Sequence, residues 1–404
     1  MHGSQKHYYG WYIAIALAIT ETISWGIIFY AFSVFITPME NDLDWSRGQL
    51  TGGFSVMLLM TAVMAFPVGA WIDKYGARLL MTLGSSGASL LLIAWSQVTG
   101  ILEFYLVWGM LGVCAAAVLY EPAFTVIATW FVRRRGIALA IVTFAAGLAS
   151  TIFIPLSDAL LGWLGWRDAV LTLGVLLGVT TIPLHALVLR RHPHDLGLTR
   201  DDQTPLDTET KKQTFDFSLG DALRSRYFWL MTLAFSLSYF SVAALRVHFI
   251  PYLIGAGFNA SLAALASGSI GILQVTGRVL YAPLEQRFSI YWMVVTVFAL
   301  QAVGISILLV NSSLLAIALF ILIFGTSYGA RTLARPSILA DQFGASHYGR
   351  ISSIMSIFLT IASTIAPFSA GLLYDISGSY APMLWSVFIF AVLATIVVIR
   401  IPKD

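Results

Sequence analysis

The sequence predicts an all-α membrane protein with twelve transmembrane helices in two six-helix bundles. Its 404 residues are 58% hydrophobic and only 11% charged, and the mean hydropathy is +0.83. Soluble domains carry roughly 25% charged residues, so a chain this apolar cannot cover a water-facing surface. A helix needs about 20 apolar residues to cross the hydrocarbon layer, and twelve stretches approach that length. They are residues 11–38, 48–71, 79–97, 101–128, 137–160, 168–189, 227–254, 262–284, 289–310, 312–333, 351–374 and 380–400.

One long polar stretch divides these segments into six and six. It runs from Arg190 to Asp221 and has the composition of a solvated linker. We therefore expect an N-terminal six-helix bundle over residues 1–190, a cytoplasmic linker over 191–221 and a C-terminal six-helix bundle over 222–404.

The positive charges orient the chain. If the N-terminus is cytoplasmic, 19 of the 23 Lys and Arg residues lie on the cytoplasmic side, and the four exceptions are Arg47, Arg167, Arg246 and Arg278. The positive-inside rule requires such an asymmetry. It predicts a multi-pass protein of the cell inner (plasma) membrane, with both termini in the cytoplasm.

The two halves share a short pattern. Gly136 and Ala149–Ile152, followed by a proline, recur as Gly349 and Ala362–Ile365, again followed by a proline. Such repeats are expected where two bundles of like fold enclose a central site. The alternative is a chance match between apolar segments.

The loop between the second and third segments carries a family signature. Gly69, Asp73, Lys74, Gly76 and Arg78 have the spacing of the signature loop of the major facilitator superfamily, which this loop resembles. Gly69 permits close helix contact and Gly76 a tight turn, while Asp73 can cap a helix N-terminus. The resemblance implies two pseudo-symmetric bundles that alternate access, with these five residues as a conformational gate. The alternative is a generic basic turn.

The corresponding loop of the second half, residues 277–288, looks like a degraded copy. Glu285 stands near the position of the signature aspartate, and Pro283 stands where glycine is common. We assign Glu285 and Arg287 to the same conformational gate.

A narrower resemblance covers parts of both halves. Gly10-Trp11 and the segment Trp130–Ala140 are similar to motifs of the monocarboxylate transporter family and the related oxalate/formate antiporters. Arg278 falls where the former family holds its carboxylate-binding arginine. Gln274 replaces the aspartate that many members carry, and Phe29 or Tyr30 lies near the position of a lysine that the first span lacks. The resemblance implies a small carboxylate as substrate, with Arg278, Gln274 and Phe29 at its site.

Ionisable side chains inside spans are candidates for function because burying a charge in a bilayer costs about 2.5–3.5 kcal/mol on insertion scales. Arg278 presents a planar donor fork that fits a carboxylate; alternatively it pairs with an acid of another helix. Glu21 lies near the middle of the first span and can carry a proton when neutral. It can instead bond polar neighbours or pair with Arg278.

Four further residues complete the candidate site. Tyr120 can donate a hydrogen bond to a carboxylate, and Tyr328 lies in the tenth span. His248 titrates near neutral pH and can bind substrate or relay protons, although a single buried histidine is more often structural. Glu121 is a candidate for proton coupling or for a pair with an arginine of the tenth span.

The sequence has no phosphate-binding loop, no His/Cys cluster suited to a metal and no nucleophile elbow with a plausible triad, so we expect neither an enzyme nor a cofactor or metal. We expect a secondary active transporter of a small organic anion, a monocarboxylate such as lactate or pyruvate, moving with a proton. Its partners are then the carboxylate, the proton and the lipid bilayer, without nucleic acid, and it works as a monomer. The alternatives are a proton-driven exporter of amphipathic or drug-like solutes, an oxalate/formate-type exchanger, and a membrane sensor without transport.

Overall fold

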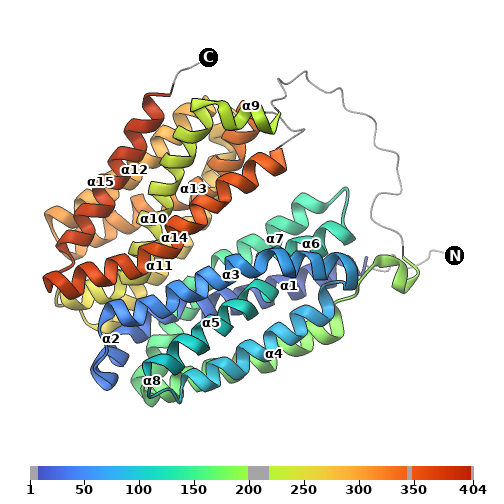
Figure 1. Cartoon of the computed structure of the whole chain (residues 1–404), viewed down its shortest axis with the longest axis horizontal. Coiled ribbons are helices and arrows are strands. Elements are labelled where there is room, and N and C mark those ends of the chain that lie inside the picture. The colour runs from blue at the N-terminus through green and yellow to red at the C-terminus, as the bar shows by residue number, and fades with distance from the viewer. Residues whose placement is uncertain (1–7, 199–217, 344–347, 402–404) are drawn as a thin grey trace. The chain divides into compact units, whose positions relative to one another are not determined.

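The computed structural model describes residues 8–198, 218–343 and 348–401, and every regular element in these ranges is a helix (Figure 1). The α-helices are α1 (Gly10–Ser24), α2 (Phe32–Leu43), α3 (Arg47–Tyr75), α4 (Ala77–Trp95), α5 (Ile101–Val118), α6 (Tyr120–Trp130), α7 (Arg135–Gly147), α8 (Ala149–Pro183), α9 (Leu219–Arg224), α10 (Arg226–Gly255), α11 (Ala260–Glu285), α12 (Ile290–Val310), α13 (Leu314–Phe343), α14 (Tyr348–Ser377) and α15 (Ala381–Ile399). The π-helices Trp25–Tyr30 and Leu184–Val188 and the 3-10 helix Pro193–Leu196 complete the list.

The described residues contain 11 helical stretches that are long and apolar enough to cross a membrane. One of them, Arg135–Val188, has 54 residues, which at helical rise is about 80 Å against a hydrocarbon layer of about 30 Å. It turns at Gly165, whose φ of 77° lies in the left-handed region that glycine tolerates. The stretch therefore supplies two spans, and the predicted all-α fold of twelve transmembrane helices is confirmed.

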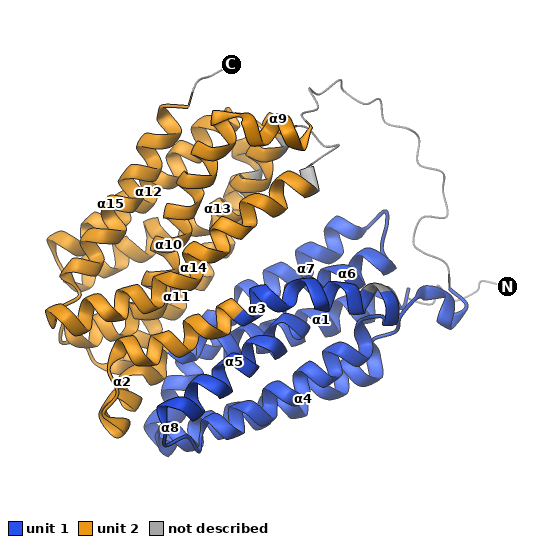
Figure 2. Ribbon diagram, in the orientation of Figure 1, with its two compact units in different colours: residues 1–32, 60–209 blue, residues 33–59, 210–404 orange. Residues whose placement is uncertain are grey.

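The chain forms two compact units (Figure 2). Unit 1 comprises residues 1–32 and 60–209, and unit 2 comprises residues 33–59 and 210–404. Contacts thus assign residues 33–59, which belong to the first two spans, to the unit that contains the C-terminal half. The predicted division into bundles at the polar linker stays a prediction.

The first span of unit 1 changes its helical winding half-way. After α1 the chain forms the π-helix Trp25–Tyr30. Gly26 faces the Phe153 ring of α8 so closely that a Cβ there would stand 2.1 Å from a ring carbon. The missing side chain therefore allows the ring to pack against the backbone at this point. Single-turn π segments are frequent at functional sites, and this one begins four residues after Glu21.

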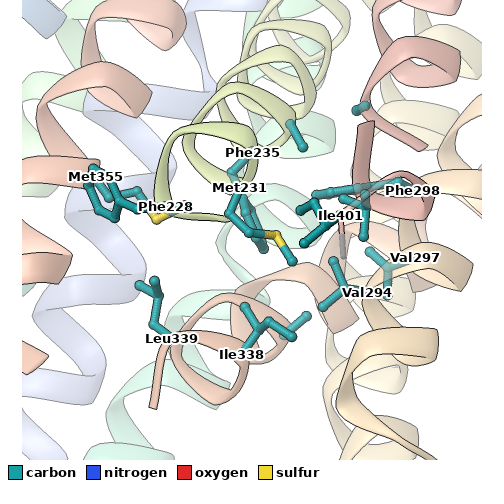
Figure 3. Packing of buried hydrophobic residues seen from close by; sticks show 14 of the residues in the cluster. Phe228, Met231, Phe235, Val294, Val297, Phe298, Ile338, Leu339, Met355 and Ile401 are labelled. Atoms are coloured by element: carbon teal, nitrogen blue, oxygen red, sulfur yellow. The ribbon is translucent and has the colours of Figure 1, made fainter. Parts of the chain in front are cut away.

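Unit 2 has an apolar core where α10, α12, α13 and α14 converge (Figure 3). Phe228, Phe235 and Phe298 are at most 1% exposed and pack with Met231 and Met355. Lipid tails are as apolar as these side chains, so their packing, rather than escape from water, holds the helices together. This core fixes the relative positions of the helices that carry the polar residues of unit 2.

Candidate functional site

Two glycines bring α11 and α13 into backbone contact in unit 2. A Cβ on Gly277 would lie 2.0 Å from the carbonyl oxygen of Thr326, and one on Gly329 would lie 2.0 Å from that of Gln274. Neither position has room for a side chain, so glycine is required for this approach. The neighbours of these glycines in the sequence, Arg278 and Tyr328, consequently lie at the same level of two touching helices.

Three arginines from three helices lie near the Tyr328 side chain. Arg246 of α10 donates a hydrogen bond from Nη1 to the Tyr328 hydroxyl at 3.4 Å. Tyr328 is also within electrostatic range of Arg278 of α11 and of Arg331, one turn further along α13. Tyr328 is 9% exposed and Gln274 is 3% exposed, so this arginine cluster (Arg246, Arg278 and Arg331) adjoins a buried polar layer.

Arg331 is the most deeply buried member of the cluster, with 3% of its surface exposed. Its Nη1 donates to Ser238 Oγ at 3.2 Å, and Ser238 in turn donates to Gln301 Oε1 at 2.6 Å. The guanidinium lies over the Tyr239 ring at 3.9 Å. Among the described residues, no carboxylate contacts Arg331. A buried cation that is held only by neutral groups favours a visiting anion.

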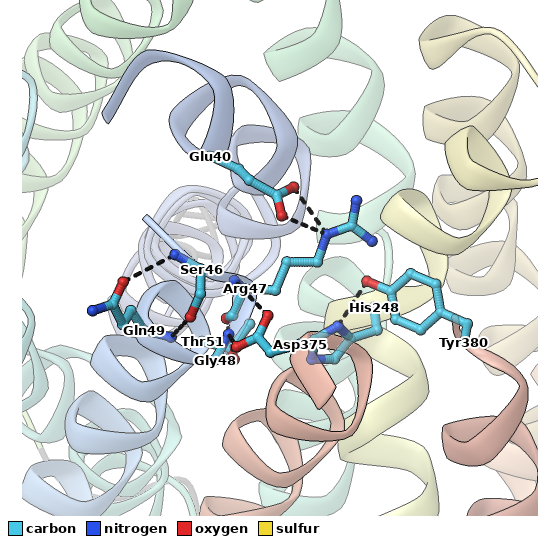
Figure 4. A network of polar contacts seen from close by, with 9 residues as sticks. All are labelled: Glu40, Ser46, Arg47, Gly48, Gln49, Thr51, His248, Asp375 and Tyr380. Atoms are coloured by element: carbon cyan, nitrogen blue, oxygen red, sulfur yellow. Dashed lines mark hydrogen bonds and ion pairs between the residues drawn. The ribbon is translucent and has the colours of Figure 1, made fainter. Parts of the chain in front are cut away.

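His248 is completely buried in α10, and both of its ring nitrogens have partners, of which Figure 4 shows Tyr380. Nε2 lies 2.9 Å from the carbonyl oxygen of Pro367, and Nδ1 lies 3.0 Å from the Tyr380 hydroxyl. Because a carbonyl can only accept, Nε2 carries the proton, and Nδ1 is free to accept from Tyr380. This arrangement suits a neutral, structural imidazole; the expected role of His248 in substrate or proton binding stays a prediction.

Glu21 forms a separate polar point in unit 1. It is fully buried; its Oε2 accepts a 3.0 Å hydrogen bond from the Trp25 indole, and no described group donates to Oε1. The Trp25 ring packs against Tyr120 at 5.0 Å and against Phe29 at 4.8 Å. The structure thus brings Glu21, Tyr120 and Phe29, all candidates from sequence, around one indole. Glu121, which follows Tyr120 in the sequence, is exposed.

The signature loop joins α3 to α4 through the tight turn expected at Gly76, which has a φ of 80°. Arg191 donates to the Lys74 carbonyl oxygen at 2.6 Å, and Arg78 donates from Nε to the Ala186 carbonyl oxygen at 2.8 Å. These bonds tie the loop to the end of the last span of unit 1.

The other predicted gate residues are less engaged. No other group lies within 4 Å of a Cβ built on Gly69, so a close helix contact there is not seen within unit 1. The side chain of Asp73 lies outside what the structure describes. Glu285 is partly buried and Arg287 is exposed. The role of all these residues as a conformational gate stays a prediction.

The two parts of the narrower sequence pattern meet in space. The ring of Trp11 lies 4.9 Å from that of Phe131, and a Cβ on Gly10 would come within 2.9 Å of the Phe131 ring. Trp130 Nε1 donates to the Arg190 carbonyl oxygen at 3.1 Å. The pattern therefore anchors the start of the first span to the segment before α7.

Comparison with known proteins decides the family. The family model described as "Major Facilitator Superfamily" matches residues 16–330 and 249–404. The chain belongs to the major facilitator superfamily. It is therefore a multi-pass membrane transporter.

Several curated relatives resemble the chain over nearly its whole length. Monocarboxylate transporter 12 of Rattus norvegicus is 25% identical over 396 residues, covering 92% of this chain and 81% of the relative. The oxalate:formate antiporter of Oxalobacter formigenes is 23% identical, covering 89% and 83%. The uncharacterised MFS-type transporter YcxA of Bacillus subtilis is 23% identical, covering 91% and 89%. These matches confirm both family resemblances expected from the sequence.

Solved structures show the same fold. A bacterial homologue of the human lysosomal transporter Spinster, crystallised in an inward-facing and unoccupied conformation, superposes with a TM-score of 0.77 at 16% identity, covering 98% of this chain and 96% of that chain. A mutant of the nucleoside transporter NupG gives a TM-score of 0.70 at 11% identity, covering 96% and 98%.

Sequence reasoning missed two members of the arginine cluster as site residues. Arg246 falls within the seventh predicted span, but the sequence assigns it no role, and the charge pattern places Arg331 on the cytoplasmic side. A signal for Arg331 was available, because residues three apart share a helix face and Arg331 follows Tyr328 at that spacing.

Proposed function

We propose that this protein is a secondary active transporter of a small organic anion that bears at least one carboxylate, and that it moves the anion together with a proton. The observation that carries the proposal is the convergence of Arg246, Arg278 and Arg331 on one buried tyrosine, Tyr328. Like charges repel, and each costs free energy to bury. An anion that enters the arginine cluster reduces both the repulsion between the arginines and the free-energy cost of burying their charges.

Arg278 is the proposed primary carboxylate-binding residue. Its guanidinium offers two parallel N–H donors, which match the two oxygens of a carboxylate. The names of two relatives support this class of substrate, since one is a monocarboxylate transporter and another an oxalate:formate antiporter. Lactate and pyruvate are the proposed first substrates to test.

Glu21 is the proposed proton carrier. A carboxylate in its fully buried setting bears the cost of an uncompensated charge, whereas the protonated acid does not. Moving a proton with a monoanion makes the load nearly neutral and avoids a membrane-potential cost of about 2.3 kcal/mol per charge per 100 mV. We place the protein in the plasma membrane as a monomer with both termini cytoplasmic, without enzymatic activity.

Uptake into proteoliposomes tests the proposal. Purified protein in vesicles should accumulate labelled lactate, pyruvate or oxalate when the external pH is below the internal pH. Protein-free vesicles and vesicles with Arg278→Gln protein should not. Absence of uptake for all three anions, with and without the pH gradient, would contradict organic-anion transport.

A further inference from the structure

Arg331, Ser238 and Gln301 form a second polar point, which the proposed carboxylate-binding role of Arg278 does not account for. Arg331 lies on α13 and is held by Ser238 of α10, which also bonds Gln301 of α12. All three residues are at most 3% exposed. Three helices thus contribute to one buried, positively charged polar point inside unit 2.

This point has an excess of hydrogen-bond donors. Arg331 Nε and Gln301 Nε2 are both buried and have no acceptor among the described residues. The Ser238 hydroxyl accepts from Arg331 and gives its own hydrogen to the oxygen of the Gln301 amide, so the bond between Ser238 and Gln301 leaves the amide nitrogen unmatched. Leaving a buried donor without an acceptor destabilises the folded protein. A ligand that supplies oxygen acceptors and negative charge would remove this cost.

The second polar point, at Arg331, lies close to Tyr328 and so to the proposed binding site of the first carboxylate at Arg278. Tyr328 is within electrostatic range of both Arg278 and Arg331, and the Arg331 guanidinium lies 5.1 Å from the centre of the Tyr328 ring. A Cβ on Gly277 would lie 3.1 Å from the backbone nitrogen of Ala330, so Arg278 and Arg331 each follow a residue of one close contact between α11 and α13. A short molecule with an anionic group at each end can reach both.

We propose that Arg331, together with Gln301, binds a second anionic group of the substrate, and that the preferred substrate is a short-chain dicarboxylate. This inference rests on the proposed function, because it assumes that Arg278 binds the first carboxylate. A monocarboxylate at Arg278 would leave the charge of Arg331 and both buried donors unmatched, whereas a dicarboxylate matches all of them.

The chain offers a matched control for Arg331. Arg335 lies four residues later on α13 and bonds the side chains of Ser352 and Ser356. It is the same residue type on the same helix, with hydroxyl partners of the same kind. Arg335→Gln therefore removes a charge from α13 while the hydrogen bonds that join Arg331, Ser238 and Gln301 stay in place.

Titration calorimetry on the purified full-length protein with succinate and lactate tests the inference. The wild type should bind succinate at least about tenfold more tightly than lactate. Arg331→Gln should lose this preference by weakening succinate while leaving lactate within about twofold. Arg335→Gln should behave as the wild type. Thermal unfolding of each variant shows whether it is folded.

Equal affinities of the wild type for succinate and lactate would overturn the dicarboxylate inference, and this comparison does not depend on the folding of any variant. An equal loss of both ligands in Arg331→Gln would also overturn it, since Arg331 would then be structural. If neither acid binds and no organic anion is transported, the proposed function itself fails. Gln301→Met, which removes the buried amide donor together with the oxygen that accepts from Ser238, should weaken succinate selectively.

Discussion

The carboxylate of Asp375 accepts the backbone N–H groups of both Arg47 and Gly48, at 3.1 and 2.9 Å (Figure 4). Asp375 belongs to α14, and the two amides are the first of α3. The Arg47 side chain lies over the Tyr374 ring at 3.8 Å and bonds Glu40 at 2.9 Å. This contact explains why residues 33–59 group with unit 2: the start of α3 is capped by a residue more than 300 positions away in the sequence.

Replacing Asp375 with alanine should lower the free energy of unfolding by about 1 kcal/mol, because a negatively charged helix cap is lost and two buried amides lose their acceptor. Thermal unfolding in detergent measures the effect. Asp44→Asn is the control, since Asp44 is exposed and asparagine tolerates its positive φ of 54°. An Asp375→Ala protein that unfolds at the wild-type temperature would show that the cap does not stabilise unit 2.

Hydropathy and charge predict the fold well, but they predict poorly how deeply a given residue lies within the helix bundle. The twelve spans and the turn at Gly76 follow from composition and from one signature loop. The tenth segment, however, is taken to end near Arg331, whereas α13 continues to Phe343. A helix longer than the hydrocarbon layer accommodates by tilting or by packing in protein, so hydropathy could not place Arg331 inside the bundle. The cap of Asp375 on α3 was equally hidden, because it joins distant segments through backbone groups.

Gly329→Ala should disrupt the arginine cluster. The new Cβ would meet the Gln274 carbonyl oxygen at 2.0 Å, so α13 must move away from α11 and carry Tyr328 from Arg278. Overpacking of this kind costs about 1–3 kcal/mol. We expect a lower unfolding temperature and at least about tenfold weaker anion binding by calorimetry. Gly162→Ala is the control, because no other group lies within 4 Å of a Cβ at that position. Wild-type affinity in the Gly329 variant would mean that the two helices need not touch.

Arg278→Gln should weaken carboxylate binding at least about tenfold, because a neutral amide cannot replace a charged donor fork. Arg278→Lys should also be impaired, since an ammonium group keeps the charge but loses the paired donors. Calorimetry with the tightest-binding acid measures both variants, and circular dichroism checks their helical content. Unchanged affinity in the glutamine variant would remove Arg278 from the site.

His248→Phe separates a structural histidine from a proton relay. The ring keeps a similar size, but Tyr380 and the Pro367 carbonyl lose their partner, which should cost about 1–3 kcal/mol of stability. If the imidazole is structural, the pH dependence of uptake in the folded fraction should match that of the wild type. A changed pH profile with unchanged stability would instead assign proton transfer to His248.

Glu21→Gln tests proton coupling directly, since glutamine imitates the protonated acid but cannot release a proton. Anion exchange between labelled and unlabelled substrate across proteoliposomes should persist in this variant, because exchange requires no net proton movement. Stimulation of uptake by an inward proton gradient should disappear. Trp25→Phe is the matched control: it removes the indole donor to Glu21 Oε2 while the carboxyl group stays, so stimulation should remain. If Glu21→Gln still responds to the gradient as the wild type does, the proton crosses on another residue.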